Sequence, residues 1–169
     1  MMPITVAVLT VSDRCARGVA QDVSGPAIVE LAKKALGAQV VATACVPDEA
    51  AAISAQLKTW ALENPWPDLI LTTGGTGLSP RDVTPEATLA VLERHHSGLL
   101  ELARLRCYAK TPRAYLSRGQ AGTLGHSLVI NLPGSPRGAT EQLEALLDVL
   151  PHAIAMLRGE PNDHDTVTS

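Results

Sequence analysis

Aromatic side chains are almost absent from this chain of 169 residues, which contains two tryptophans, two tyrosines and no phenylalanine. The hydrophobic core must therefore consist of Leu, Val, Ile and Ala. Proteins that bind single-stranded nucleic acids usually stack the bases on aromatic side chains, and this sequence offers almost none. An excess of positive charge is also missing, because 14 lysines and arginines stand against 17 aspartates and glutamates, for a net charge of −3. We therefore expect neither nucleic acid nor an anionic membrane surface as a partner.

Long apolar runs and targeting signals are lacking as well. No stretch reaches the roughly 20 apolar residues of a membrane span, and the first residues lack the basic and apolar regions of a signal peptide. The three cysteines lie far apart and indicate no disulfide framework. These absences predict a cytoplasmic protein. The length fits one domain, which we place at residues 1–159, followed by a polar, non-periodic tail at 160–169.

Short strand-like runs alternate with segments of helical periodicity along the chain. Apolar runs rich in β-branched residues lie at 4–11, 39–46, 69–73 and 128–131. Helical stripes or N-cap signals lie at 24–36, 48–64, from 84 onward, at 97–108 and from 135 onward. This alternation is typical of a three-layer αβα domain with a mostly parallel sheet. The glycine-containing region 119–130 interrupts the pattern and predicts either a small antiparallel ribbon or a bulged strand.

Polar or glycine-rich segments directly follow four of these strands. They are Ser12-Asp13-Arg14, Pro47-Asp48-Glu49, the loop 74–82 and the loop 132–136. In a parallel sheet the carboxyl ends of the strands meet at one edge, and ligands bind in the crevice outside that edge. We therefore expect these four segments to form one site.

Two of the segments have the properties of anion sites. Glycines in Gly74-Gly75-Thr76-Gly77 allow a ligand to approach the backbone, and consecutive amides there can form an anion-binding hollow. The loop matches neither a Walker A motif nor the Rossmann fingerprint. Gly134-Ser135 precedes a helix, whose first amides and dipole also favour negative charge. The basic residues Arg14, Arg81, Lys110 and Arg118 can donate to phosphates. Arg81 is the best candidate among them because it lies beside the first loop.

The carboxylates near these loops leave several roles open. Thr84-Pro85 has the pattern of a helix N-cap and first residue, so Asp82 is free for another role, such as binding Mg²⁺. A magnesium ion bound to phosphates typically takes only one or two protein carboxylates. Asp48 fits either a helix N-cap or a functional carboxylate. Asp13 fits either a brace for its own loop or a functional residue.

Beyond these local features, the chain resembles the MogA/MoaB family, which includes the G domains of plant and animal molybdenum-cofactor proteins. The similarity rests on Thr72 to Gly77 continuing into Arg81 to Ala87, on Ser12-Asp13-Arg14 with Gly18 and Asp22, on 117–122 and on 131–136. These segments occur in the family's order and extend the similarity to nearly the whole chain. The resemblance implies a molybdopterin adenylyltransferase, which transfers AMP from ATP to molybdopterin, releases pyrophosphate and uses Mg²⁺.

The resemblance also implies roles for individual residues. It makes Asp48 and Asp82 the catalytic and metal-binding carboxylates. The residues expected to bind substrate or nucleotide are Ser12, Asp13, Gly74, Gly75, Thr76, Gly77, Arg81, Ser117, Arg118, Pro133, Gly134 and Ser135. The family further implies a homotrimer and a hand-over of the product to a molybdenum-insertion protein. The alternative function is a trimeric molybdopterin carrier without catalysis, as in the MoaB branch.

Overall fold

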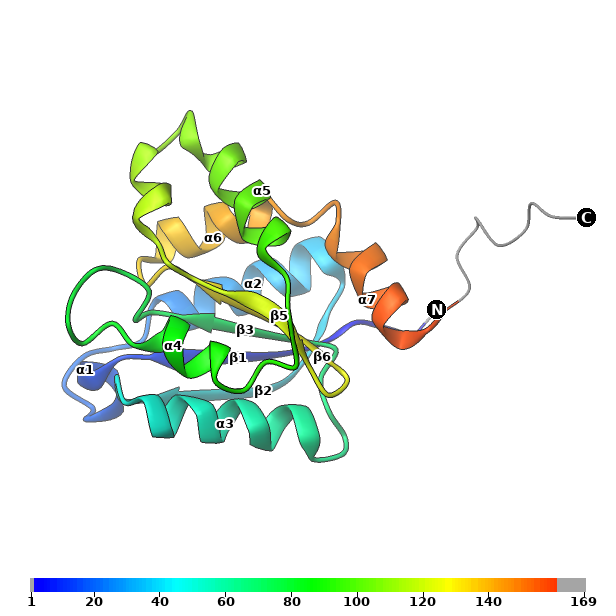
Figure 1. Ribbon diagram of the computed structural model, residues 1–169, viewed down its shortest axis with the longest axis horizontal. Coiled ribbons are helices and arrows are strands. Elements are labelled where there is room, and N and C mark those ends of the chain that lie inside the picture. The colour runs from blue at the N-terminus through cyan, green and yellow to red at the C-terminus, as the bar shows by residue number, and fades with distance from the viewer. Residues whose placement is uncertain (1, 161–169) are drawn as a thin grey trace, which may run out of the picture.

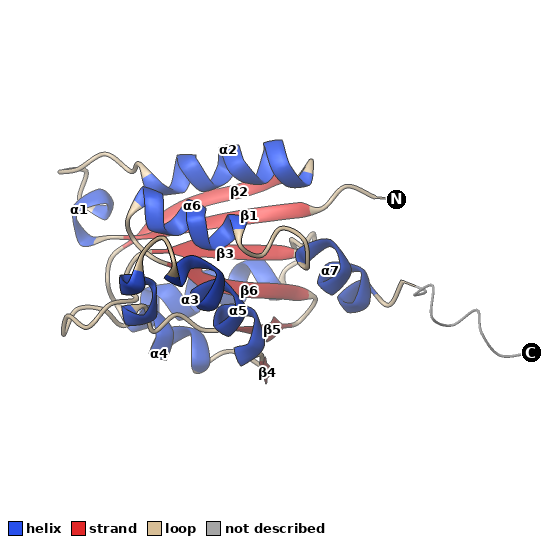
Figure 2. Cartoon of the chain, turned by 90° about the horizontal axis from the view of Figure 1, so that it is seen from above, coloured by secondary structure: helices blue, strands red, loops and turns tan. Residues whose placement is uncertain are grey.

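A computed structural model describes residues 2–160 and shows a six-stranded sheet with the order β2-β1-β3-β6-β5-β4. The strands are β1 (Thr5–Val11), β2 (Gln39–Val46), β3 (Leu69–Thr73), β4 (Arg94–His95), β5 (Ala121–Leu124) and β6 (Ser127–Leu132). Figure 2 shows these strands side by side across the middle of the molecule. The predicted αβα architecture is confirmed. The predicted tail 160–169 lies, apart from Glu160, outside the described residues.

Helices cover both faces of the sheet. They are α1 (Asp13–Ala16), α2 (Ser24–Leu36), α3 (Ala50–Leu62), α4 (Thr84–Leu89), α5 (Ser97–Tyr108), the 3-10 helix η1 (Pro112–Leu116), α6 (Pro136–Glu144) and α7 (Leu150–Arg158). The core on one face takes its helical residues from α2, α5, α6 and α7, and the core on the other face from α3 and α4. In Figure 1, α2 and α6 lie on the side of the sheet opposite to α3. Within residues 2–160, no helix is both long and apolar enough to cross a bilayer.

The centre of the sheet is parallel and fully covered. β1 pairs with both β2 and β3, and β3 pairs with β6, always in parallel. All five residues of β3 are buried, and so are all six of β6. A strand buried on both faces has no reason to alternate polar and apolar residues, which explains the uninterrupted apolar runs Leu69–Leu71 in β3 and Leu128–Ile130 in β6.

The glycine-containing region forms an antiparallel ribbon at one edge of the sheet. β5 pairs antiparallel with β6, and the short β4 pairs antiparallel with β5. Gly125 in the β5–β6 turn has a φ of 55°, which favours glycine. Of the two predicted alternatives, the ribbon is therefore correct.

Two predicted helix caps are wrong. The N-cap of α3 is Glu49, whereas the Asp48 side chain accepts a hydrogen bond from the amide of Asp13. Helix α4 starts one residue earlier than predicted, since Val83 is its N-cap and the Thr84 hydroxyl donates to the Gly74 carbonyl. Asp48 thus bonds to the segment after β1, and Thr84 bonds to the glycine loop after β3, so neither side chain caps its own helix. The cap predicted at Ser135 is confirmed, because its hydroxyl accepts from the amide of Gly138.

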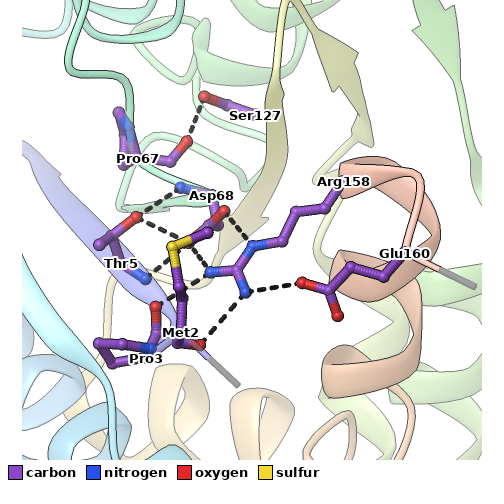
Figure 3. Close-up of polar contacts among 8 residues, drawn as sticks. All are labelled: Met2, Pro3, Thr5, Pro67, Asp68, Ser127, Arg158 and Glu160. Carbon is purple, nitrogen blue, oxygen red and sulfur yellow. Dashed lines mark hydrogen bonds and ion pairs between the residues drawn. The ribbon is translucent and has the colours of Figure 1, made fainter.

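A polar cluster fixes the C-terminal helix α7 to the N-terminal ends of β1 and β3 (Figure 3). The Arg158 guanidinium donates to both carboxylate oxygens of Asp68, at 2.7 and 2.8 Å. Asp68 also accepts from the amide and the hydroxyl of Thr5 at the start of β1. The Arg158 and Asp68 side chains are only 16% and 14% exposed. The pair therefore joins α7 to β1 and to the segment before β3.

Replacing one member of this pair tests its contribution to stability. Asp68→Asn should lower the free energy of unfolding at pH 7 by about 2 kcal/mol, because the largely buried guanidinium of Arg158 then loses its closer carboxylate partner and keeps the longer pair with Glu160, at 3.3 Å. Burial by itself raises the pKa of Asp68, but hydrogen bonds from Arg158 and Thr5 outweigh it and hold the pKa below its usual value. The stabilisation is therefore complete above the unfolded pKa of about 3.9 and is lost as the pH falls through the folded-state pKa.

Urea unfolding of both proteins between pH 7 and pH 3 measures this difference. The gap between parent and Asp68→Asn should narrow toward pH 3. Asp148→Asn is the matched control, because its partner Arg106 and Asp148 itself are 40% and 60% exposed and solvent weakens such pairs. A gap of the same size at both pH values would show that the charge of Asp68 does not stabilise the fold.

Candidate active site

The four predicted segments meet at the carboxyl edge of the sheet, on the left in Figure 1, and line two neighbouring clefts. The larger cleft has a volume of about 600 Å³ and the smaller one of about 350 Å³. Gly75, Asp82 and Gly134 line both clefts. The predicted convergence of the strand-end segments is therefore what the structure shows.

Asp13 and Asp48 connect the segments that follow β1 and β2. The amide of Asp13 donates to Asp48 Oδ2 at 2.9 Å, and the amide of Asp48 donates to Asp13 Oδ1 at 3.0 Å. Arg81 adds a third element, since its guanidinium donates to Asp13 Oδ2 at 2.6 and 3.1 Å. Chiefly because of the hydrogen bond from Arg81, the pKa of Asp13 is below its usual value. Asp13 thus acts as a brace that keeps Asp48 in place.

Asp82 lies where the two clefts meet. Its Oδ2 atom accepts from the amide of Ser79 at 2.9 Å, which fixes the side chain within the loop after β3. Asp48 and Asp82 both line the smaller cleft. Among the hydrogen bonds of residues 2–160, each of the two carboxylates uses Oδ2 and leaves Oδ1 for a ligand.

The donor set at this place fits a magnesium ion that is shared with phosphates. Residues 2–160 contain no group of three or more His, Cys, Asp or Glu side chains placed to hold a metal by themselves. Mg²⁺ commonly binds one or two carboxylates and takes its other ligands from waters and substrate phosphates. Asp48 and Asp82 match that pattern, whereas a closed zinc-type site would need four protein ligands.

The glycine loop packs so closely against its neighbours that a side chain at Gly75 or Gly77 would clash. Gly75 has a φ of 67°, and a Cβ atom there would lie 2.3 Å from Thr84 Oγ1 and 3.2 Å from Asp48 Oδ1. A Cβ atom at Gly77 would lie 2.9 Å from Asp82 Oδ2. The backbone of this loop therefore runs directly beside both candidate carboxylates. A Cβ atom at Gly134 would lie 3.2 Å from the Cα of Gly74, so the two anion-site loops are in contact.

Ser117 and Arg118, which precede β5, form hydrogen bonds with the glycine loop. Ser117 donates from its hydroxyl to Thr76 Oγ1 at 3.1 Å. The Arg118 guanidinium donates to the carbonyls of Gly77 and Asp82, both at 2.8 Å, and pairs with Glu86. These contacts place Arg118 as a support for the loop that carries Asp82.

The predicted site residues fall into two groups by position. Asp13, Arg81 and Arg118 line neither cleft. The others line at least one cleft, namely Ser12, Asp48, Gly74, Gly75, Thr76, Gly77, Asp82, Ser117, Pro133, Gly134 and Ser135. The three that do not line a cleft form ion pairs within the protein, Asp13 with Arg81 and Arg118 with Glu86.

The larger cleft contains Lys110, which was predicted as a possible phosphate donor, and further residues that the sequence did not indicate. Among these are Arg113, Arg137 and Gln142, and Arg137 is paired with Glu141 Oε1 at 2.8 Å. Arg137 directly follows the predicted Ser135-Pro136 helix start, which was the one available signal in the sequence. Arg113 comes from η1 and Gln142 from the second turn of α6, and no local motif connects them to the strand ends.

Substituting a glycine in the loop tests its close packing. Gly75→Ala should destabilise the protein by about 3 kcal/mol or more, because strain at positive φ adds to the clash with Thr84. Gly37→Ala is the matched control, since Gly37 has a φ of 59° but no atom within 4 Å of the position that a Cβ would take, and it should cost only about 1 kcal/mol. Thermal and urea unfolding measure both. Equal losses would show that positive φ alone, and not close packing, selects glycine at position 75.

Comparison with known proteins places this arrangement in a family. A family profile described as a probable molybdopterin binding domain matches residues 7–152. The molybdopterin adenylyltransferase of Helicobacter pylori strain J99 is 40% identical over 160 residues, which cover 94% of this chain and 90% of that protein. The molybdenum cofactor synthesis protein cinnamon of Drosophila melanogaster is also 40% identical, but the chain spans only 26% of its length.

Solved structures give the same result for the fold. The crystal structure of the molybdopterin biosynthesis enzyme MoaB from Thermus thermophilus superposes with a TM-score of 0.87 at 51% identity, covering 94% of this chain and 98% of that one. The profile extends over most of the chain and through all four strand-end segments. The chain therefore belongs to the family of molybdopterin-binding domains that the MogA/MoaB resemblance predicted.

Proposed function

We propose that this protein is a Mg²⁺-dependent molybdopterin adenylyltransferase that transfers AMP from ATP to the terminal phosphate of molybdopterin. The observation that supports this most directly is the position of Asp48 and Asp82 on one cleft, each beside the amide-rich glycine loop. The adenylyltransferase name of the Helicobacter relative, which the chain matches over most of its length, agrees with this reaction.

The reaction brings two anionic groups together. A phosphate oxygen of molybdopterin attacks the α-phosphorus of ATP and forms a new P–O–P bond. The bond from the α-phosphorus to the oxygen that bridges to the β-phosphorus breaks, and pyrophosphate leaves with that oxygen. Side chains have little covalent chemistry to perform in such a transfer, so positioning and charge neutralisation provide the catalysis.

The residues of the site divide these tasks. Asp48 and Asp82 would hold the metal through their Oδ1 atoms, and bound Mg²⁺ would neutralise phosphate charge and stabilise the departing pyrophosphate. The amides of 75–77 and 134–135 would bind phosphate oxygens, whereas the amide of Gly74 donates to the Leu132 carbonyl. Lys110, Arg113 and Arg137 would attract anionic substrates into the larger cleft.

The two clefts provide room for two substrates that react with each other. Their shared residues, Gly75, Asp82 and Gly134, form the boundary where the phosphates would meet. None of the residues that line either cleft is aromatic. Adenine would therefore be held by polar groups and aliphatic contacts and not by stacking on an aromatic ring.

Asp13, Arg81 and Arg118 act on the site from outside the clefts. Asp13 keeps Asp48 in place with the help of Arg81, and Arg118 binds the carbonyl of Asp82. In our proposal these residues mainly position the two carboxylates. A direct role of Arg81 or Arg118 as a phosphate ligand would require each to leave its protein partners.

Replacing either carboxylate should stop the reaction while the fold remains. Asp82→Asn keeps an oxygen that can accept from Ser79, and we expect its kcat for pyrophosphate release to fall at least about 100-fold. Asp48→Asn should behave similarly. Purified protein with molybdopterin, ATP and Mg²⁺ provides the assay, and Asp148→Asn, which lines neither cleft, is the matched control.

Molybdopterin binding separates the two candidate functions. The adenylyltransferase predicts that Asp82→Asn still binds molybdopterin, and that EDTA stops pyrophosphate release until Mg²⁺ is restored. A correctly folded parent that binds molybdopterin but releases no pyrophosphate above background would support the non-catalytic carrier instead.

We also propose that the protein is a homotrimer, acts in the cytoplasm and passes its product to a molybdenum-insertion protein. Exposed apolar side chains on α5 and η1, including Leu105, Tyr108, Tyr115 and Leu116, are available for contacts with other protein chains. Because the family resemblance implies three subunits, sedimentation equilibrium should give a mass about three times that of the 17.7-kDa chain. A mass near that of one chain at micromolar concentration would contradict the trimer.

A further inference from the structure

Helix α6 forms one wall of the larger cleft along its length. Ser135, Gly138 and Gln142 all line this cleft. Their spacing of three and four residues puts them on one face of a helix. At a rise of 1.5 Å per residue, Gln142 lies about 10 Å along the helix axis from Ser135. The cleft therefore extends from the N-terminus of α6 to the start of its last turn.

The N-terminal end of this wall suits a phosphate. Ser135 caps the helix and occupies the amide of Gly138, and Pro136 has no N–H. The amide of Arg137 then remains without a helical partner, as first-turn amides do. The side chain of Arg137 lines the same end of the cleft, where it pairs with Glu141 Oε1 at 2.8 Å. A helix start alone would not define a ligand site, but a second feature lies further along the same wall.

That feature is the unsatisfied carboxamide of Gln142. The residue is only 3% exposed, and its Nε2 atom is buried without a hydrogen-bond partner among the described residues. A buried donor without a partner destabilises a protein by about 1–3 kcal/mol, and native structures contain few of them. Because Gln142 lines the cleft, a bound ligand can supply the missing partner.

The surroundings of Gln142 suit a flat, mostly uncharged group. Cys107, Ala114 and Leu116 provide apolar surface in the same cleft. Cys107 is 3% exposed, and its thiol donates to the Glu141 carbonyl, so it does not compete for the carboxamide. A carboxamide offers one acceptor and two donors from one planar group. It therefore matches the edge of a nitrogen heterocycle that presents a donor beside an acceptor, as in the pairing of Gln with adenine.

We propose that Gln142 is a specificity-determining residue that binds the hydrogen-bonding edge of a nitrogen heterocycle whose phosphate lies at the N-terminus of α6. This inference rests on the proposed function, which supplies two ligands of that chemistry, the pterin of molybdopterin and the adenine of ATP. In both, a phosphate group is linked to a heterocycle with adjacent donors and acceptors. The distance along α6 between its N-terminus and Gln142 would then select ligands by the distance between their phosphate and their heterocycle.

The test compares Gln142→Met with the parent protein in separate binding measurements. Molybdopterin, handled without oxygen, and ATP with Mg²⁺ are titrated individually by calorimetry. We expect about tenfold weaker binding of one ligand and a change of less than about twofold for the other. The ligand that loses affinity identifies which heterocycle Gln142 contacts. The melting temperature without ligand should stay the same or rise, because the unsatisfied buried donor is gone.

Gln56→Met on α3, at the other face of the sheet, is the matched control and should leave both affinities unchanged. If Gln142→Met does not fold, Gln142→Asn retracts the carboxamide by one methylene and should weaken the same single ligand. Unchanged affinities for both ligands, or equal losses for both, would overturn the role of Gln142. A parent protein that binds neither ligand would instead refute the proposed function, so the two failures are distinguishable.

Discussion

Parallel pairing of β2, β1, β3 and β6 is the constraint on which the site depends. Since these strands run in the same direction, the segments that follow them must all emerge at one edge. The register also sets fine distances, because Val11 pairs with Val46 and the amide of Ser12 donates to the Val46 carbonyl. This contact brings Asp13 and Asp48 into position for their reciprocal hydrogen bonds. A shift of β2 against β1 would separate them.

The structure divides the predicted charged residues of the site into those that line the clefts and those that hold other residues. Asp48 and Asp82 face the clefts, whereas Asp13, Arg81 and Arg118 are bound to protein groups. Arg104 on α5 extends this support, because it donates to the carbonyls of Ser117 and Gly119. Catalysis by positioning needs such supports, since a charged ligand of a metal must be oriented before the substrate arrives. The net charge of −3 does not reveal that the basic residues Lys110, Arg113 and Arg137 line the larger cleft.

Local sequence patterns were sufficient for the architecture and for the location of the site. The parallel strands β1, β2, β3 and β6 stand out as short apolar runs, and α2 and α5 as helical patterns, and their observed bounds lie close to those predicted. The convergence of four loops followed from topology alone. Asp48 was ambiguous because an aspartate before a helix satisfies the local rule for an N-cap. Its actual partner, Asp13, is 35 residues away, and no local pattern contains that contact.

The absence of long-range contacts from local sequence patterns also explains why Gln142 and Arg113 were not predicted. Gln142 and Arg113 lie on helices that pack beside the strand ends only in the folded chain. The charge of Arg81 and Arg118 favoured phosphate binding, but it could not show that the nearest anions and carbonyls belong to the protein itself. Sequence thus predicts which loops form a site more readily than which side chains in those loops face the ligand.

A crystal structure with Mg²⁺ and a non-hydrolysable ATP analogue tests the central proposal most directly. We expect one metal ion between the triphosphate and the Oδ1 atoms of Asp48 or Asp82, at about 2.1 Å from the carboxylate oxygen. A triphosphate bound with its metal away from both aspartates would contradict the assignment of these residues and the mechanism built on them.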